Sequence, residues 1–368
     1  TLIAARDRAG EKPLYWTLTP RGLLLASEVK ALLVRPEVSR ELDPISLDQF
    51  LTYEYVLAPR TLLKGVHKVP PAHFLRYKDG EATVHRYWDA ADVELKAWDD
   101  HDAAAALRSA LATAVQRQLM AEVPLGAFLS GGIDSSSIVG LMSLASNQAV
   151  NTFSIGFSDG TYNELPYARE VAALFRTNHR ERQASPDLGD MFERLIVHLD
   201  EPFADVSLFP TFSVSELARE HVKVVLSGDG GDELFGGYDA YQAQALAAKL
   251  GWMGDALMPA IAGVASALPP TQKKKGLVNK VKRFSAGATT APSDIGHYRW
   301  MVYLGAREKA RLYNGGLREA LSATDVYAPV REALGRFSQD DVLNRQLYAD
   351  LSLYLADDIL VKVDRMSM

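Results

Sequence analysis

The chain has 368 residues, of which 48% are hydrophobic and 23% charged, a composition typical of a globular protein with one or two domains. Its net charge of −6 disfavours a general nucleic-acid binder, and the lack of cysteine excludes disulfides, thiolate metal sites and a cysteine nucleophile within these residues. The best membrane candidate, residues 256–268, is shorter than the roughly twenty residues that span a bilayer. We therefore expect a cytoplasmic protein that binds neither nucleic acid nor membrane.

Strand and turn signals dominate residues 1–90, which we expect to form one domain. The runs RGLLLAS and HFLRYKDGEATVHRYW predict strands, and Lys78-Asp79-Gly80-Glu81 predicts a hairpin turn within the second run. Residues 91–101 predict a linker. A helical pattern then begins near Asp102 and opens a second domain, expected over residues 102–368.

The second domain starts with short apolar runs that alternate with helical patterns. We predict strands over residues 124–129, 151–156 and 221–226. We predict helices over residues 135–145, 164–175, 188–198 and 208–219. This alternation is typical of an α/β fold with a parallel sheet and helices on both faces. Beyond about residue 238 the pattern is mostly helical, and the basic run QKKKG at 272–276 is interpreted as a solvated loop.

The first predicted strand of this sheet ends in SGGIDSS, residues 130–136. Ligands of parallel sheets bind beyond the carboxyl ends of the strands. Gly131 and Gly132 let the backbone approach a ligand. The hydroxyls of Ser130, Ser135 and Ser136 and the N–H groups at the start of the next helix can donate to a phosphate. Asp134 would repel a phosphate unless a cation such as Mg²⁺ bridges them. The alternative is that Asp134 caps the helix.

A second strand end carries a similar loop, LSGDGGDELFGGY, with Asp229, Asp232 and Glu233. Two such loops can hold the phosphates and the metal of a nucleotide between them. A calcium loop is the alternative, but the oxygen ligands lack the EF-hand spacing. GFSDG at 156–160 matches the nucleophile elbow of serine hydrolases, although the helix that the elbow needs begins too late.

These motifs together resemble a known family. SGGIDSS is similar to the pyrophosphate loop of N-type ATP pyrophosphatases, and SIGFSDGTYNELPYAREVA, LDEPFADVS, LSGDGGDELFGGY and DDILVKVDRMSM resemble motifs of glutamine-dependent asparagine synthetases. ARDRAGEKPLYW, LLLASEVKALL and GVHKVPPAHFLRY resemble the last third of that family's glutaminase domain. The resemblance covers nearly the whole chain. It implies an ATP pyrophosphatase fold preceded by the C-terminal part of a β-rich, N-terminal-nucleophile glutaminase domain.

The resemblance also implies a reaction. ATP adenylates a substrate carboxylate with release of pyrophosphate, and ammonia from glutamine displaces AMP to give an amide. The implied cofactors are ATP and Mg²⁺, the implied partners are a small carboxylate acceptor and glutamine or ammonia, and a homodimer stays open.

Site residues carry over from the family motifs one by one. The residues implied to bind ATP and pyrophosphate are Leu129, Ser130, Gly131, Gly132, Asp134, Ser135, Ile155, Ser227 and Gly228. Asp134 and Asp232 are the implied Mg²⁺ ligands, and Asp229 is the implied catalytic proton acceptor from ammonia. The residues implied to lie near the substrate are Asp205, Lys362, Asp364 and Arg365. The alternatives are a helix cap for Asp205 and surface charges for the other three.

The chain departs from the family pattern at Asp229, where asparagine synthetases proper usually carry glutamate. The carboxylate is then set back by about one methylene, and catalysis responds to shifts of about 1 Å. Asparagine from aspartate stays slightly favoured. A relative that amidates a sugar acid, a peptide or a natural-product precursor is the alternative, as is a non-catalytic nucleotide-binding relative. The resemblance further places the glutaminase cysteine upstream of Thr1 and a later lysine beyond Met368, so we expect a longer gene product.

Overall fold

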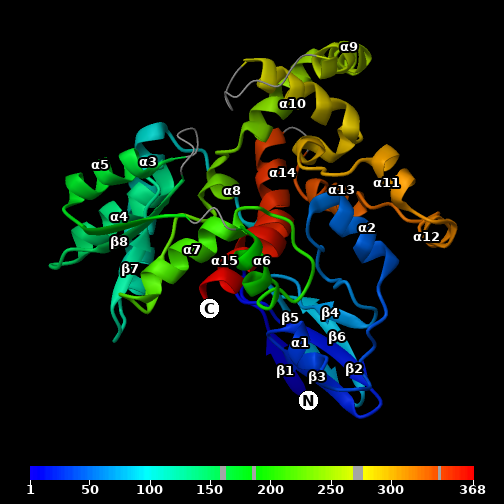
Figure 1. Cartoon of the computed structure of the whole chain (residues 1–368), viewed down its shortest axis with the longest axis horizontal. Coiled ribbons are helices and arrows are strands. Elements are labelled where there is room, and N and C mark those ends of the chain that lie inside the picture. The colour runs from blue at the N-terminus through cyan, green and yellow to red at the C-terminus, as the bar shows by residue number, and fades with distance from the viewer. Residues whose placement is uncertain (158–162, 185–187, 268–276, 339–340) are drawn as a thin grey trace. The chain divides into compact units, whose positions relative to one another are not determined.

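The computed structural model describes residues 1–157, 163–184, 188–267, 277–338 and 341–368 (Figure 1). QKKKG and most of GFSDG lie outside these described residues. The chain divides into two compact units, each assembled from three stretches. The first unit comprises Thr1–Asp92, Leu199–Asp205 and Asp232–Val361, and the second comprises Val93–His198, Val206–Gly231 and Lys362–Met368.

Two small antiparallel sheets open the first unit. One has the strand order β1 (Leu2–Ala5), β5 (His73–Lys78), β6 (Glu81–Arg86), and the other has the order β3 (Gly22–Ala26), β2 (Tyr15–Thr19), β4 (Val66–Lys68). The predicted hairpin is confirmed, because Lys78 pairs with Glu81 across the β5–β6 turn. Asp79 and Gly80 have φ of 51° and 88°, the left-handed conformations that a tight two-residue hairpin turn requires.

Two helices connect these strands. Helix α1 (Val29–Leu32) buries Val29 and Leu32 against Tyr15 and Val66 of the second sheet. Helix α2 (Pro44–Tyr53) begins at Asp43, whose carboxylate accepts hydrogen bonds from the N–H groups of the first turn. Its last residue, Tyr53, packs edge-on against Tyr298 with the ring centroids 6.3 Å apart, so α2 joins the helical part of the same unit.

The helical part of the first unit follows residue 231, and the prediction of a mostly helical region is confirmed. Its elements are α8 (Gly231–Phe235), α9 (Asp239–Ala267), α10 (Leu277–Thr290), η2 (Ser293–Trp300), α11 (Ala306–Leu312), α12 (Gly315–Ala320), α13 (Ala328–Leu334), α14 (Val342–Ala349) and the π-helix η3 (Asp350–Ile359). The last helix, α15 (Leu360–Ser367), belongs mostly to the second unit. A buried cluster that includes Ile295, Tyr298, Val330 and Leu353 forms its core. None of the described helices is both long and apolar enough to cross a membrane.

The second unit contains the predicted parallel sheet. Its strand order is β10 (Val224–Leu226), β7 (Leu125–Phe128), β8 (Asn151–Gly156), β9 (Asn178–Gln183), and all three pairings are parallel. Its helices are α3 (Asp100–Gln118), α4 (Ile133–Ala145), α5 (Leu165–Phe175), α6 (Leu188–Ile196) and α7 (Leu208–Arg219), whereas the short η1 (Ala90–Asp92) still belongs to the first unit. Helix α3 begins two residues before Asp102 and is capped by Asp99. The edge strand β9, with the polar sequence NHRERQ, was not among the predicted strands.

Helices cover both faces of this sheet, so the predicted fold class is confirmed (Figure 1). Ala127 belongs to a core with Val115 of α3 and Val139 of α4, whereas its neighbour Phe128 packs into a second core with Leu217 of α7. Successive side chains of a strand point to opposite faces. The two apolar cores therefore hold β7 in the middle of the unit, and its carboxyl end is fixed in space.

Candidate functional site

The carboxyl end of β7 is a point where the strand order reverses. From β7 the chain continues through α4 to its neighbour β8, while the neighbour on the other side, β10, is reached only after α7. Ala127 of β7 lies beside Leu226 of β10, so the loops that follow these two strands start next to each other. Such switch points are where open α/β sheets bind their ligands.

Hydrogen bonds between Ser130 and Ser135 hold the first loop. Leu129 is buried and its N–H donates to the carbonyl of Phe153 at 2.9 Å, which extends the strand pairing by one residue. The N–H of Ser130 donates to Oγ of Ser135 at 3.2 Å, and the two hydroxyl oxygens are 3.0 Å apart. The N–H of Gly132 donates to Oγ of Ser130 at 3.2 Å. Two of the three hydroxyls predicted to bind phosphate, those of Ser130 and Ser135, are thus fixed at the start of α4.

Gly131 and Gly132 of this loop are required for different structural reasons. Gly131 has φ of 85°, and a Cβ there would lie 2.5 Å from Cβ of Tyr167 and 2.6 Å from the backbone nitrogen of Ala168 at the start of α5. Gly132 is the N-cap of α4, and no side-chain hydrogen bond caps this helix. The first N–H groups of α4 therefore face the open side of the loop, where an anion could accept their hydrogen bonds. Because Gly132 is the N-cap, the alternative role of Asp134 as the cap is wrong.

The second loop lies directly on the first. A Cβ at Gly228 would come within 2.7 Å of the backbone nitrogen of Ser135, and a Cβ at Gly231 would come within 2.5 Å of Cγ and Oδ1 of Asp134. A turn holds this loop, since the N–H of Gly231 donates to the carbonyl of Gly228 at 3.2 Å. The Asp134 carboxylate is therefore in contact with the second loop. Sequence reasoning missed the role of Gly231, for which the doubled glycine of SGDGGDE was the available signal.

The remaining predicted residues of the nucleotide site follow from these two loops. Ile155 lies near the end of β8, the strand next to β7, and is half-buried. The N–H of Asp229 donates to Oγ of Ser227 at 3.4 Å, and Asp229 is exposed to solvent. The residues of the second unit that the structure gathers at neighbouring strand ends are Leu129, Ser130, Gly131, Gly132, Asp134, Ser135, Ile155, Ser227, Gly228 and Asp229.

Asp232 belongs to the first unit and lies in α8, and its carbonyl holds the glycine turn that follows this helix. Its carbonyl accepts from the N–H groups of Gly236 and Gly237 at 2.9 and 3.1 Å. A Cβ at Gly237 would overlap Oδ1 of Asp232, which fixes the carboxylate against the backbone. Its neighbour Glu233 is buried and accepts from the hydroxyl of Tyr238 at 2.5 Å, and burial raises the pKa of Glu233.

Among the described residues, one group of three side chains is arranged to share a metal ion: Asp99, His101 and Asp102 at the exposed start of α3. It includes neither predicted Mg²⁺ ligand. Exposed acidic groups of this kind are common without a metal, and this group lies away from both glycine loops in the sequence.

Of the residues expected near the substrate, three lie on α15. Lys362, Asp364 and Arg365 are all buried, so their alternative as surface charges is wrong. The ammonium of Lys362 donates to Oγ of Ser207 at 2.7 Å within the second unit. Asp205 lies in the first unit just before α7. Helix α7 has Ser207 as its N-cap and no side-chain cap, so the alternative of Asp205 as a cap is also wrong.

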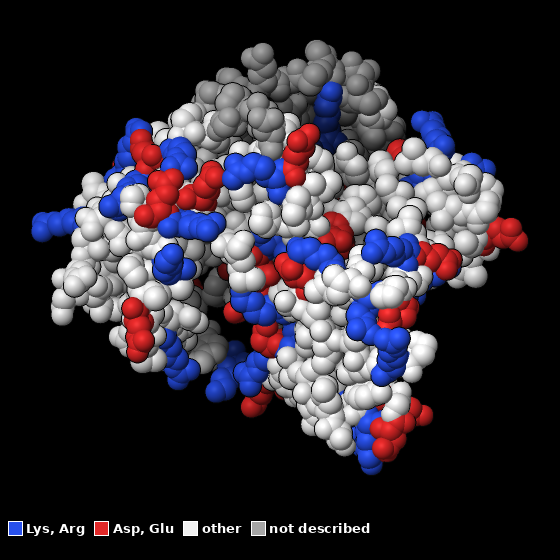
Figure 2. Space-filling model, turned by 60° about the horizontal axis from the view of Figure 1, so that its bottom comes forward, with Lys and Arg blue, Asp and Glu red and all other residues white. Residues whose placement is uncertain are grey.

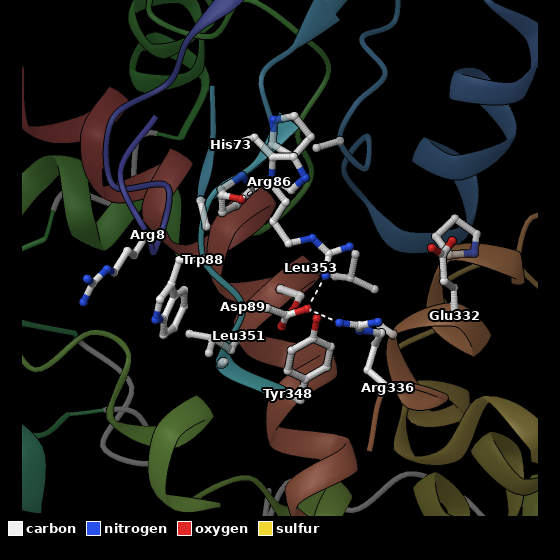
Figure 3. Close-up of a pocket in the computed structure, with 18 of the residues that line it drawn as sticks. Arg8, His73, Arg86, Trp88, Asp89, Glu332, Arg336, Tyr348, Leu351 and Leu353 are labelled. Carbon is white, nitrogen blue, oxygen red and sulfur yellow. Dashed lines mark hydrogen bonds and ion pairs between the residues drawn. The ribbon is translucent and has the colours of Figure 1, made fainter. Parts of the chain in front are cut away.

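A cavity of about 250 Å³ lies in the first unit, and its lining contains none of the predicted site residues (Figure 3). Its centre is Asp89, whose carboxylate accepts charged hydrogen bonds from Arg86 at the end of β6 and from Arg336 after α13. Burial alone would raise the pKa of Asp89, but hydrogen bonds from the N–H of Ala91, the Tyr348 hydroxyl and Arg336 lower it below its ordinary value. The cavity is thus lined by residues of the amino-terminal part and of α13 and α14. Its central carboxylate, Asp89, is paired with two arginines.

Surface charge gives no second site on the face shown in Figure 2. Lysines and arginines alternate there with aspartates and glutamates. Charged side chains of the described residues are often paired, for example Arg182 with Glu220 at 2.6 Å and Arg194 with Glu216 at 2.9 Å.

Comparison with known proteins separates the chain into two matched regions. The asparagine synthase family model matches residues 106–368, and the glutamine amidotransferase domain model matches residues 1–88. Asparagine synthetase [glutamine-hydrolyzing] 1 of Bacillus subtilis is 31% identical over 370 residues, which cover 100% of this chain and 56% of the relative. A putative asparagine synthetase of Mycobacterium tuberculosis is 33% identical over 376 residues, with the same shares of 100% and 56%.

One further relative has a different name. Amidase chyE of Penicillium rubens is 31% identical over 310 residues, which cover 78% of this chain and 44% of the amidase. The chain spans about half the length of the curated relatives that it matches.

Proposed function

The chain belongs to the asparagine synthetase family, and from that premise we propose that it forms the synthetase part and the end of the glutaminase part of an ATP-dependent amidotransferase. A carboxylate oxygen of the acceptor attacks the α-phosphorus of ATP, and pyrophosphate leaves. Ammonia from glutamine then attacks the acyl carbon, loses a proton and expels AMP. The observation that carries this proposal is the contact of the two glycine loops at Asp134 and Gly231.

The first loop suits a pyrophosphate. The start of α4 lacks a side-chain cap, and the hydroxyls of Ser130 and Ser135 are fixed beside it. A Cβ at Gly132 would meet Oγ of Ser130 at 3.3 Å and no other neighbouring group, so the outer side of the loop has room for a ligand. In the proposed complex Ser130, Gly131, Gly132 and Ser135 bind the pyrophosphate. The adenosine lies along Leu129, Ile155, Ser227 and Gly228, the family's backbone positions.

Asp134 and Asp232 are the proposed Mg²⁺ ligands. Asp134 stands in the first turn of α4, where a phosphate and a carboxylate would repel each other, and hard oxygen ligands are those that Mg²⁺ takes. Bound there, Mg²⁺ would supply positive charge to the leaving pyrophosphate. These two carboxylates would hold the ion, and the tight packing of Asp134 against Gly231 and of Asp232 against Gly237 keeps the carboxylates in place.

Asp229 is the proposed proton acceptor for the attacking ammonia. It is exposed on the second loop, and ammonia that has added to an acyl carbon must lose a proton before AMP leaves. Asp205, Lys362, Asp364 and Arg365 are proposed to lie near the acceptor. Aspartate is slightly favoured as that acceptor, and the relative named as an amidase supports the alternative of another carboxylate.

The test is ATP-dependent pyrophosphate release by the full gene product with Mg²⁺ and an ammonium salt, across a panel of carboxylates headed by aspartate. Release with aspartate, and asparagine in the product, supports the ordinary reaction. Release with a different acid alone identifies a specialised amidotransferase and its acceptor. No release with any carboxylate would refute the proposed enzyme and favour a nucleotide-binding relative.

A further inference from the structure

A buried lysine joins three stretches of the first unit that are far apart in the sequence. Lys68 ends β4 and is 5% exposed. Its Nζ donates to the carbonyl of Val56 at 2.5 Å and lies 3.4 Å from Oε2 of Glu201 and 3.8 Å from Oδ1 of Asp357. A buried ammonium group is unfavourable unless carboxylates pair with it. Burial would lower the pKa of Lys68, but the charges of Glu201 and Asp357 outweigh burial and raise it.

Each of the two carboxylates also binds the backbone between α2 and β4. Oε1 of Glu201 accepts from the N–H of Leu62 at 2.5 Å, and Oδ2 of Asp357 accepts from the N–H of Ala58 at 2.7 Å. Each group therefore offers one oxygen to the main chain and the other to Lys68. Without the lysine, two buried carboxylates would face each other with no cation between them, and both backbone contacts would weaken.

Glu201 belongs to Leu199–Asp205, the stretch that the first unit takes from the middle of the synthetase-type sequence. This stretch has further attachments on both sides of Glu201. The carboxylate of Asp200 accepts from the N–H groups of Val29 and Lys30 at the start of α1, at 2.9 and 3.3 Å. The N–H of Ala204 donates to the carbonyl of Glu54 at 3.0 Å. Residues of the glutaminase-type part thus hold the stretch along its length.

Asp205, the last residue of the stretch, lies close to this attachment. Burial first, and the negative charge of Asp205 second, raise the pKa of Glu54. Glu54 ends α2 with φ of 73°, a left-handed conformation that is uncommon for a non-glycine residue. The surrounding contacts hold this conformation, and the carbonyl of Glu54 accepts the hydrogen bond from the N–H of Ala204.

We propose that Lys68 is a positioning residue: it fixes Leu199–Asp205 on the glutaminase-type part and so holds Asp205 in place for the carboxylate acceptor. The acceptor half of this statement rests on the proposed function, whereas the fixing of the stretch does not. The glutaminase-type part then has a second task beside ammonia supply, because it shapes the acceptor site of the synthetase-type part.

The first experiment is hydrogen–deuterium exchange on the full gene product with Lys68→Met. Peptides that cover 54–63 and 199–206 should exchange about tenfold faster than in the wild type, while peptides of α14 and of the β5–β6 hairpin stay within about twofold. Lys64→Met is the matched control, because Lys64 is an exposed lysine near the same strand, paired with exposed Glu41. Unchanged exchange in the two peptides, or equal acceleration throughout the unit, would overturn the positioning role.

A second variant covers the case in which Lys68→Met fails to fold. Glu201→Gln keeps an oxygen for the N–H of Leu62 and removes one of the two charges that face Lys68. It should accelerate exchange of the same two peptides by about threefold. Identical exchange in Glu201→Gln and the wild type would argue against the proposal.

Kinetics then test the acceptor half. In Lys68→Met the KM for the carboxylate should rise about tenfold, while kcat and the KM for ATP stay within about twofold of the wild type. Lys68→Arg keeps the positive charge and should bring the KM for the carboxylate most of the way back to the wild-type value. Loosened exchange with an unchanged KM for the carboxylate would refute the acceptor half. If the wild type releases no pyrophosphate with any carboxylate, the proposed function fails, while the exchange data still decide whether Lys68 fixes the stretch.

Discussion

Gly228 lies so close to the first turn of α4 that a Cβ would stand 2.7 Å from the backbone nitrogen of Ser135. Backbone of a helix cannot move aside as a flexible side chain can. Gly228→Ala should therefore separate the two glycine loops by a fraction of an ångström to 1 Å. We expect pyrophosphate release to fall by about 100-fold, since catalysis is that sensitive to misplacement. Gly315→Ala is the control, because a Cβ there meets nothing within 4 Å; wild-type turnover by Gly228→Ala would contradict the prediction.

The Mg²⁺ proposal predicts the same result from two residues in different stretches. Asp134→Asn and Asp232→Asn should each abolish pyrophosphate release while the circular dichroism spectrum stays unchanged, because the amide keeps the shape and loses the charge that binds the cation. Raising the Mg²⁺ concentration should recover part of the activity. Asp102→Asn, at an exposed aspartate, is the control. Normal turnover in either site variant would refute that residue as a ligand.

Substitution of Asp229 should affect amide formation but not ATP binding. Asp229→Asn removes the proposed proton acceptor but leaves the loop glycines in place. We expect amide formation to fall by about 100-fold or more, the range of general-base catalysis, with little change in ATP affinity. Product amide and bound ATP are measured in parallel. Equal loss of both would indicate that Asp229 maintains the loop and does not accept the proton.

The sequence predicted the parallel sheet and its loops because β7 and β8 lie in largely apolar runs that lead into glycines, Gly131 after β7 and Gly156 at the end of β8. It did not predict β9, since an edge strand has one partner and can carry a polar sequence. Arg180 and Arg182 in β9 look like loop residues until β8 is placed beside them. For the site, motif spacing identified Ser130 and Ser135.

Spacing could not show that Gly231 abuts Asp134, because that contact depends on the alignment of two strands about 100 residues apart. The burial of Lys68 escaped prediction for the same reason. Its partners Glu201 and Asp357 lie far along the chain, and their type alone suggests surface residues.

The first unit contains a buried ion pair whose loss should cost stability. Nζ of Lys309 lies 2.5 Å from Oδ1 of Asp48, which also accepts from the hydroxyl of Tyr313 at 2.5 Å. Asp48→Ala leaves a buried cation without a counter-charge, and we expect the free energy of unfolding to fall by about 3 kcal/mol in a urea titration. Glu37→Ala removes a half-buried partner of the solvent-accessible Arg35 and should cost much less. Similar losses in both variants would contradict the assigned burial.

Asp89 should make the first unit sensitive to acid. Its pKa is lowered in the folded protein, so its stabilisation is complete above the ordinary aspartate pKa of about 3.9 and is lost as the pH falls through the folded value. The difference in free energy of unfolding between the wild type and Asp89→Asn should be constant from about pH 7 to 5 and shrink below about pH 4. Glu94→Gln, at an exposed residue, provides the control. A difference that does not change with pH would refute the role of the Asp89 charge.

The stretch Leu199–Asp205 has a consequence for how such proteins evolve. Asp200 accepts a hydrogen bond at the start of α1, and Glu201 pairs with Lys68. A stretch of the synthetase-type sequence therefore depends on specific contacts with the glutaminase-type part. A recombination event that replaced residues 1–92 with those of a distant homologue would bring in a foreign partner for both carboxylates. Such hybrids should be rare, and Lys68 should change in natural lineages only together with Glu201 or Asp357. We therefore expect the two parts to be exchanged together in evolution and not one at a time.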